Sequence, residues 1–262
     1  MKSFFRMTYP YCLWIGIFIV APMIMILLYA LTRTTSNSVL TFEFTLDNFS
    51  RFFTDPLFPK ILLKSLKVAL ITTVICLLVG YPMAMFISGR TEKVQTVLIL
   101  LLTLPMWINM LLKTYAWRGI LEDMKMDSEI KVFIGMVYDF LPYMIIQIHT
   151  AISKLDRDLF TASYDLGANK FQTFRKVMLP LSVPGIISGI TLVFLPAVSS
   201  FAIPQMLGGG DYQLIGSLIE QYFITTGEWN FGSAISLLMA LIIILSMRMT
   251  RKLDREASAE EA

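Results

Sequence analysis

Residues 154–185, KLDRDLFTASYDLGANKFQTFRKVMLPLSVPG, form the longest polar interruption between two strongly apolar runs of this sequence. In its first half, apolar and small residues recur at steps of three and four, which predicts one face of an amphipathic helix; they are Leu155, Leu159, Ala162, Ser163 and Leu166. Gly167 is expected to end this helix in the left-handed conformation, and a second short helix is expected to stop at Pro180. Two short helices joined at a glycine predict a projection that docks into a partner, with a surface-lying loop as the alternative.

Six apolar runs surround this stretch. Hydrophobic residues make up 56% of the 262 residues and charged residues only 16%, against about 25% in soluble domains, and the mean hydropathy is +0.67. Such runs are long enough to cross a bilayer as helices and too uniformly apolar for the strands of a membrane barrel. We therefore predict an all-α membrane protein with six transmembrane helices, at residues 11–31, 66–88, 94–112, 130–152, 184–207 and 231–247.

These runs divide the chain into segments. We expect an N-terminal tail and first helix at 1–31, an extracytoplasmic loop with a short helix at 32–65, a transmembrane core at 66–247 with a polar loop at 153–183, and a tail at 248–262. Four prolines within the runs predict kinks; they are Pro82, Pro105, Pro142 and Pro196. With both termini inside, the inner loops and tails carry a majority of the 22 basic residues, which predicts that orientation.

Composition excludes several classes of site. The chain has a single histidine, His149, which favours a structural role over a metal centre or a catalytic triad. Cys12 and Cys76 both lie within apolar runs, so a disulfide between them is not expected. The sequence carries no GxxxxGK[ST] phosphate loop and no HExxH or GxSxG motif. We therefore expect a chain that is not an enzyme and binds no ATP, metal or cofactor itself.

The polar stretch resembles the cytoplasmic loop of bacterial ABC importer permeases, which has the form EAA, three residues, G, nine residues, I-x-L-P. The matching positions are Thr161, Ala162, Ser163, Gly167, Val177, Leu179 and Pro180, at the same spacing. Thr161 replaces the glutamate of the family, Ser163 the second alanine and Val177 the isoleucine. The surrounding phrases, including DLGANKFQTFRKV, LVFLPAVSSFAIPQMLGGG and WNFGSA, resemble the PotB-type permeases of spermidine/putrescine importers over most of the chain.

This resemblance implies a MetI-like, type-I importer permease in the bacterial inner membrane. It implies a second homologous permease as partner, two ATPase subunits that bind ATP and Mg²⁺, and an extracytoplasmic polyamine-binding protein, with no role for nucleic acid. Coupling to the ATPase is then assigned to the 154–185 loop, through Thr161, Ala162, Ser163, Asp165, Leu166, Gly167, Ala168, Leu179 and Pro180.

A polar stripe in the fourth run is the first candidate for the substrate path. Asp139, Tyr143, Gln147 and Thr150 recur at helical spacing within an otherwise apolar segment. An intramembrane aspartate costs about 2.5 to 3.5 kcal/mol on insertion scales and favours a functional role; a bond to backbone loosened by Pro142 is the structural alternative. Because no basic residue lies one helical turn from Asp139 on its own helix, a cation in transit is expected as its counter-ion.

Aromatic and acidic residues near the outer ends of the runs are further candidates. Trp107, Asn109 and Tyr115 could guide an ammonium group or form an interfacial belt. Asp211 and Glu220 follow a glycine turn at 208–210 and are candidates for an outer cation site. Spacing alone does not show whether these residues form an interfacial belt or a gate in the substrate path.

Two other functional readings remain open at the level of sequence. A related permease could carry another organic cation or small solute. A stand-alone secondary carrier would need no partner, but it would leave the docking loop without a function.

Overall fold

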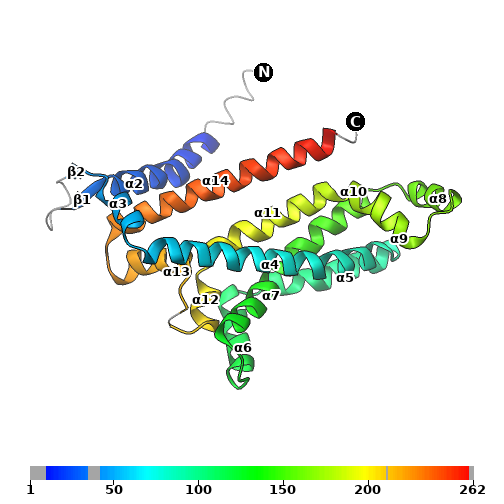
Figure 1. The fold of residues 1–262 in the computed structure, drawn as a ribbon, viewed down its shortest axis with the longest axis horizontal. Helices are drawn as coiled ribbons and strands as arrows, with labels where there is room; N and C mark the ends of the chain where they lie inside the picture. The colour runs from blue at the N-terminus through cyan, green and yellow to red at the C-terminus, as the bar shows by residue number, and fades with distance from the viewer. Residues whose placement is uncertain (1–9, 35–41, 211, 260–262) are drawn as a thin grey trace. The chain divides into compact units, whose positions relative to one another are not determined.

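The chain folds into helices and one small β-hairpin in the computed structural model, which describes the backbone of residues 10–34, 42–210 and 212–259 (Figure 1). It divides into two compact units, residues 1–62 with 218–243 and residues 63–217 with 244–262. Helices α4, α13 and α14 run from one unit into the other. Each unit is described by itself.

The first unit begins with the N-terminal helix and the hairpin. In chain order it contains η1 (Gly16–Val20), α2 (Ala21–Ala30), β1 (Thr32–Thr34), β2 (Phe42–Phe44), α3 (Asp47–Thr54), the start of α4 (Leu57–Ser88), η4 (Gln221–Thr225) and the start of α14 (Trp229–Ala259). The two strands are antiparallel, with Thr32 opposite Phe44. The short helix expected between residues 32 and 65 is α3.

Two asparagines fix the end of α2 within this unit. Asn48 Nδ2 on α3 donates to the carbonyls of Ala30 and Thr32 at 3.0 and 3.1 Å. Asn230 Nδ2 on α14 donates to the carbonyls of Tyr29 and Thr32 at 3.0 and 2.8 Å. The last carbonyls of a helix have no partner within it, so these amides supply the hydrogen bonds that the helix end lacks.

The second unit holds most of the remaining helices. They are α5 (Glu92–Thr103), η2 (Leu104–Trp107), α6 (Met110–Glu122), α7 (Ser128–Ser153), α8 (Arg157–Asp165), α9 (Lys170–Thr173), η3 (Phe174–Met178), α10 (Leu179–Leu181), α11 (Val183–Ser199), α12 (Ala202–Leu207) and the first half of α13 (Ile215–Glu220). The most buried face of α7 carries apolar side chains, among them Met136, Met144 and Ile148.

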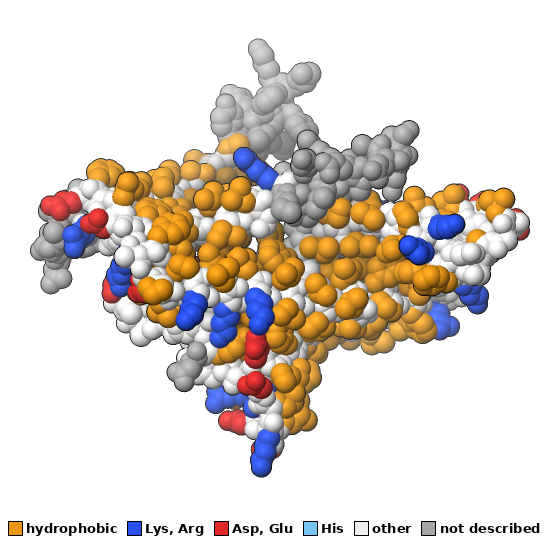
Figure 2. Space-filling view, viewed as in Figure 1, with side chains coloured by type: hydrophobic (Ala, Val, Ile, Leu, Met, Phe, Trp, Pro, Cys, Tyr) orange, Lys and Arg blue, Asp and Glu red, His pale blue; other side chains and the backbone are white. Residues whose placement is uncertain are grey.

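Four described helices are long and apolar enough to cross a membrane without interruption: Pro10–Ala30, Leu57–Ser88, Ser128–Ser153 and Trp229–Arg248. Two bent pairs pass the same test, Glu92–Trp107 with Met110–Glu122 at 91° and Lys170–Leu181 with Val183–Ser199 at 63°. Counting each pair as one span gives six. Hydrophobic side chains cover much of the surface along α4 and α5, as lipid-facing helices require (Figure 2).

The third and fifth predicted spans need correction. The third run is not one straight helix, because Pro105 lies in the 3₁₀ turn η2 and the Asn109 side chain caps a new helix by accepting the Leu111 N–H at 2.9 Å. In the fifth run, α11 ends at Ser199 and the short helix α12 is separate. Pro82, Pro142 and Pro196 lie inside helices that continue past them.

Close packing of α11 against α7 depends on two glycines that the sequence reasoning did not single out. A Cβ at Gly185 would overlap the Ala151 Cβ and lie 3.0 Å from the Gln147 carbonyl oxygen, and one at Gly189 would lie 2.6 Å from the Met144 Sδ. Their spacing, small-xxx-small, is a known signal for close helix packing in membranes and could have identified this contact.

Candidate functional site

The first candidate site is the short helix α8 and the turn that follows it. Asp156 begins α8 by accepting the Asp158 N–H at 3.0 Å. At the other end Gly167 has φ +82°, and its N–H donates to the Tyr164 carbonyl while the Ala168 N–H donates to the Ser163 carbonyl. This pair of hydrogen bonds is the Schellman motif. The prediction that Gly167 ends the helix in the left-handed conformation is confirmed.

The second short helix begins at a capping box. Asn169 Oδ1 accepts the Gln172 N–H at 2.9 Å, and Gln172 Oε1 accepts the Asn169 N–H at 2.8 Å. A hydrogen bond of 2.8 Å between the Ser163 and Thr173 hydroxyl oxygens joins α8 to α9. Thus the serine that replaces the second alanine of the family loop orients the two helices.

The second short helix ends at Leu181, one residue past Pro180, close to the predicted stop. The chain continues from α9 through the π-helical turn η3 into α10, where Pro180 stands in the first turn. The bend comes two residues later, at Ser182, whose Oγ lies 2.7 Å from the Tyr81 Oη.

Much of the apolar surface of this projection is not covered by the chain. Leu166 is 89% exposed, Phe171 68% and Leu159 45%. Of the other predicted coupling residues, Thr161, Ala162, Asp165, Gly167 and Pro180 are also exposed, whereas Ser163, Ala168 and Leu179 are half-buried. Exposed apolar side chains on a structured projection indicate a docking surface. We call residues 157–173 the coupling surface.

A second candidate site joins α6 to α7. Lys113 Nζ lies 2.5 Å from Asp139 Oδ1, and the two side chains are only 11% and 13% exposed. The expectation that a cation in transit is the counter-ion of Asp139 therefore needs correction, because in this structure the counter-ion is a lysine of the chain itself. The lysine comes from a different helix, so the spacing along α7 could not reveal it.

The structure distributes the other candidates for the substrate path over several elements. Tyr143 and Gln147 lie farther along α7, with Tyr143 38% exposed and Gln147 close to Gly189 of α11. Trp107 and Tyr115 are 76% and 65% exposed, and the side chain of Asn109 caps α6. Glu220 is half-buried at the end of α13, in the first unit, and Asp211 lies outside the described residues.

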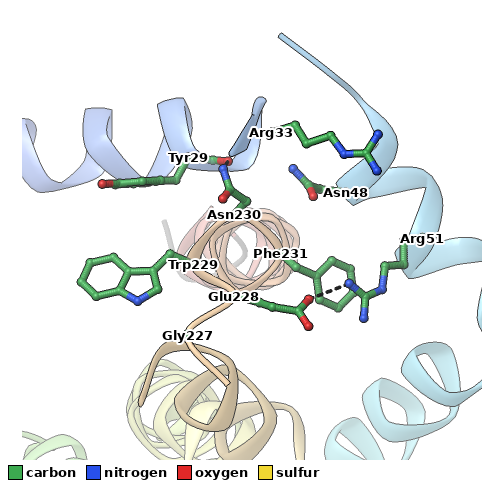
Figure 3. Close-up of a pocket in the computed structure, with 9 residues that line it drawn as sticks. All are labelled: Tyr29, Arg33, Asn48, Arg51, Gly227, Glu228, Trp229, Asn230 and Phe231. Carbon is green, nitrogen blue, oxygen red and sulfur yellow. Dashed lines mark hydrogen bonds and ion pairs between the residues drawn. The ribbon is translucent and has the colours of Figure 1, made fainter. Parts of the chain in front are cut away.

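A pocket of about 500 Å³ lies in the first unit, where α3 and the start of α14 meet the end of α2 (Figure 3). Arg51 donates to Glu228 at 2.7 Å there, and its guanidinium lies 4.2 Å from the centroid of the Phe231 ring. Asn48 and Asn230 already bond to the end of α2. These polar groups serve to hold the unit together, so we do not assign a ligand to this pocket.

Comparison with known proteins identifies the fold. Residues 76–258 match the family described as binding-protein-dependent transport system inner membrane component. The chain belongs to this family. The permease is 37% identical over 269 residues to the spermidine/putrescine transport system permease protein PotB of Haemophilus influenzae, covering 94% of each chain. It is 36% identical to PotB of Escherichia coli, covering 94% of this chain and 98% of that one.

Solved structures share the fold of the permease at low sequence identity. A chain of a bacterial ABC transporter that imports the acidic polysaccharide alginate aligns with a TM-score of 0.78 and 14% identity, over 97% of this chain and 96% of that one. A chain of the inward-facing MetNI methionine ABC transporter aligns with a TM-score of 0.62 and 14% identity, over 76% and 94% of the two chains. The predicted MetI-like, all-α permease fold is confirmed.

Proposed function

We propose that the permease imports polyamines, spermidine and putrescine, as half of the translocation pathway of an ATP-driven importer. The observation that carries this proposal is the 37% identity to a spermidine/putrescine permease over 94% of both chains. Likeness to the alginate and methionine transporters supports the fold alone, because those identities are 14%.

The proposed partners follow from the same relationship and from the coupling surface. A second homologous permease completes the pathway, two ATPase subunits bind ATP and Mg²⁺, and a polyamine-binding protein delivers the substrate from outside. The exposed Leu166 and Phe171 are the side chains that we expect to enter the ATPase. The Thr161 hydroxyl donates a hydrogen bond to the Arg157 carbonyl of its own helix, at 3.4 Å. Thr161 replaces the glutamate of the family loop, so we expect this chain to dock without a carboxylate at that position.

The proposed orientation places both termini and the coupling surface in the cytoplasm, with α3 outside. This orientation puts the loop at Arg90 and Lys93 inside, together with the basic residues of the coupling surface. ATP-driven closure of the two ATPase subunits would then move α8 and α9 and change which side of the membrane the pathway faces.

Reconstitution into liposomes tests this function. The chain alone should show no uptake of radiolabelled spermidine, whereas the chain with its partner permease, the ATPase, the binding protein and internal ATP should concentrate it. Uptake by the chain alone would support a secondary carrier instead. ATP-dependent uptake of a different solute, with none of spermidine or putrescine, would reject polyamines as the substrate while retaining the importer.

A further inference from the structure

The pair formed by Lys113 and Asp139 differs from the other ion pairs of the described residues. Its side chains are 11% and 13% exposed, whereas those of the other four pairs are between 41% and 73% exposed. Burying two charged groups costs desolvation free energy, and their mutual attraction often does no more than offset it. Apolar side chains of similar size at these positions would often stabilise the fold equally well. A purely structural role therefore gives little reason for charge at this position.

The position of Lys113 connects the pair to the break in the third span. Lys113 lies one turn into α6, whose first turn is capped by Asn109, directly after the 91° bend. Asp139 lies in the middle of α7, a single helix that is long and apolar enough to cross the membrane. The ion pair therefore attaches the second half of a broken span to a straight neighbour.

The chemistry of the pair matches the proposed substrate. The lysine side chain ends in a primary alkylammonium group, which is also the terminal group of spermidine and putrescine. Asp139 is thus observed holding, in a largely buried setting, the functional group that a polyamine would present to it. A carboxylate that exchanges one ammonium for another is never left buried without a counter-ion, which is the costly state for such a group.

We propose that Lys113 is a tethered counter-ion that occupies the ammonium site of Asp139 when the path is empty and exchanges with an ammonium group of the polyamine during transport. This inference rests on the proposed function. Competition from the tethered lysine keeps the site from holding the substrate too tightly to release it. No covalent step is involved, and the charge at Asp139 stays balanced throughout.

Aromatic rings next to the pair offer a place for the displaced lysine. Trp117 follows Lys113 by four residues on α6, so the two side chains share a helix face. The Trp117 ring packs edge to face on Tyr138, the neighbour of Asp139, with ring centroids 5.2 Å apart. The face of an indole ring attracts an ammonium group. The released Lys113 is expected to move towards Trp117.

The double variant Lys113→Gln/Asp139→Asn tests the exchange in the purified complex. Its two amides are able to hydrogen-bond to each other and carry no charge. We expect wild-type assembly and melting temperature but at least a tenfold loss of spermidine uptake at limiting substrate. The matched control is Arg118→Gln/Glu122→Gln, which neutralises an exposed pair on the same helix and should leave uptake unchanged. Wild-type uptake by the Lys113/Asp139 double variant would overturn the proposal.

The single variant Lys113→Gln gives a second, independent measurement. It leaves Asp139 without its tethered partner, so millimolar spermidine, putrescine or propylammonium should raise the melting temperature of the complex more than in the wild type. Adding Asp139→Asn should abolish that increment. An equal shift in wild type and Lys113→Gln would refute the exchange. Propylammonium needs no transport, so this result stands even if the wild-type complex takes up no polyamine and the proposed function itself fails.

Discussion

Gly167 shows how a single backbone conformation shapes the coupling surface. Its φ of +82° turns the chain between α8 and α9, and its surroundings are open, with nothing within 4 Å of where a Cβ would stand. Any cost of substitution at this position therefore comes from the backbone and not from a steric clash. The spacing of the sequence predicted this turn because the hydrogen bonds of a helix end are local.

Replacing Gly167 with valine should uncouple ATP hydrolysis from transport. A β-branched residue in the left-handed region costs about 1–2 kcal/mol, so the turn should open and misdirect α9. Asparagine tolerates this region and is the matched control. We expect complexes of normal abundance in both variants, with stimulated ATP hydrolysis and uptake lost only in Gly167→Val. Full activity of the valine variant would show that the turn is not part of the coupling.

The contact between Lys113 and Asp139, in contrast, could not be predicted from the spacing of residues. The lysine stands directly after the third apolar run, 94–112, so the predicted spans did not place it in the membrane beside Asp139. Lys113 and Asp139 are also separated by 26 positions and lie on different helices. Their contact depends on how α6 leaves the bend at residues 108–109, which no helical periodicity specifies.

The packing of the helices α11 and α7 depends on which atoms of α7 lie beside Gly185 and Gly189 of α11. A Cβ at Gly185 would meet the backbone carbonyl of Gln147 and the Cβ of Ala151, neither of which can move without shifting a helix. A Cβ at Gly189 would meet the Met144 Sδ, which lies near the end of a flexible side chain. The same substitution should therefore have different effects at the two positions.

Gly185→Ala should lower the yield and melting temperature of the complex, whereas Gly189→Ala should leave both close to wild type. Overpacking of this kind typically costs about 1–3 kcal/mol. Adding Ala151→Gly to Gly185→Ala removes one of the two overlaps and should restore part of the lost stability. Size-exclusion yield and thermal unfolding in detergent measure the effect. Equal behaviour of the two alanine variants would contradict the packing argument.

The existence of the apolar helices could be predicted because lipid requires every backbone group to be bonded within its own helix. Their ends could not, since α4 already begins at Leu57, in the predicted loop, and α14 continues to Ala259, in the predicted tail. The interruptions could not be placed as well. Pro105 and Asn109 were visible as a helix breaker and a cap, yet the 91° angle between the two halves depends on contacts with other helices. The second bend, at Ser182, involves a hydrogen bond to Tyr81 on α4, which lies far away in the sequence.

At the scale of the whole molecule, the proposed orientation predicts which loops an impermeant reagent reaches. Asp47 and Asn169 are both exposed, and the two free cysteines, Cys12 and Cys76, can be replaced with alanine to give a clean background. A cysteine at position 47 should be labelled by an impermeant maleimide in intact cells, whereas one at 169 should be labelled only after the membrane is opened. The reverse pattern would place the coupling surface outside and reject coupling to a cytoplasmic ATPase.

The attachment of the first helix has a consequence for how this chain can vary. Most of its apolar side chains along 10–28 lie exposed, and the amides of Asn48 and Asn230 hold its end through backbone carbonyls. A carbonyl is present whatever the side chain, so this attachment places little demand on the residues of the helix itself. These hydrogen bonds therefore constrain Asn48 and Asn230 more than the side chains of the helix whose end they hold.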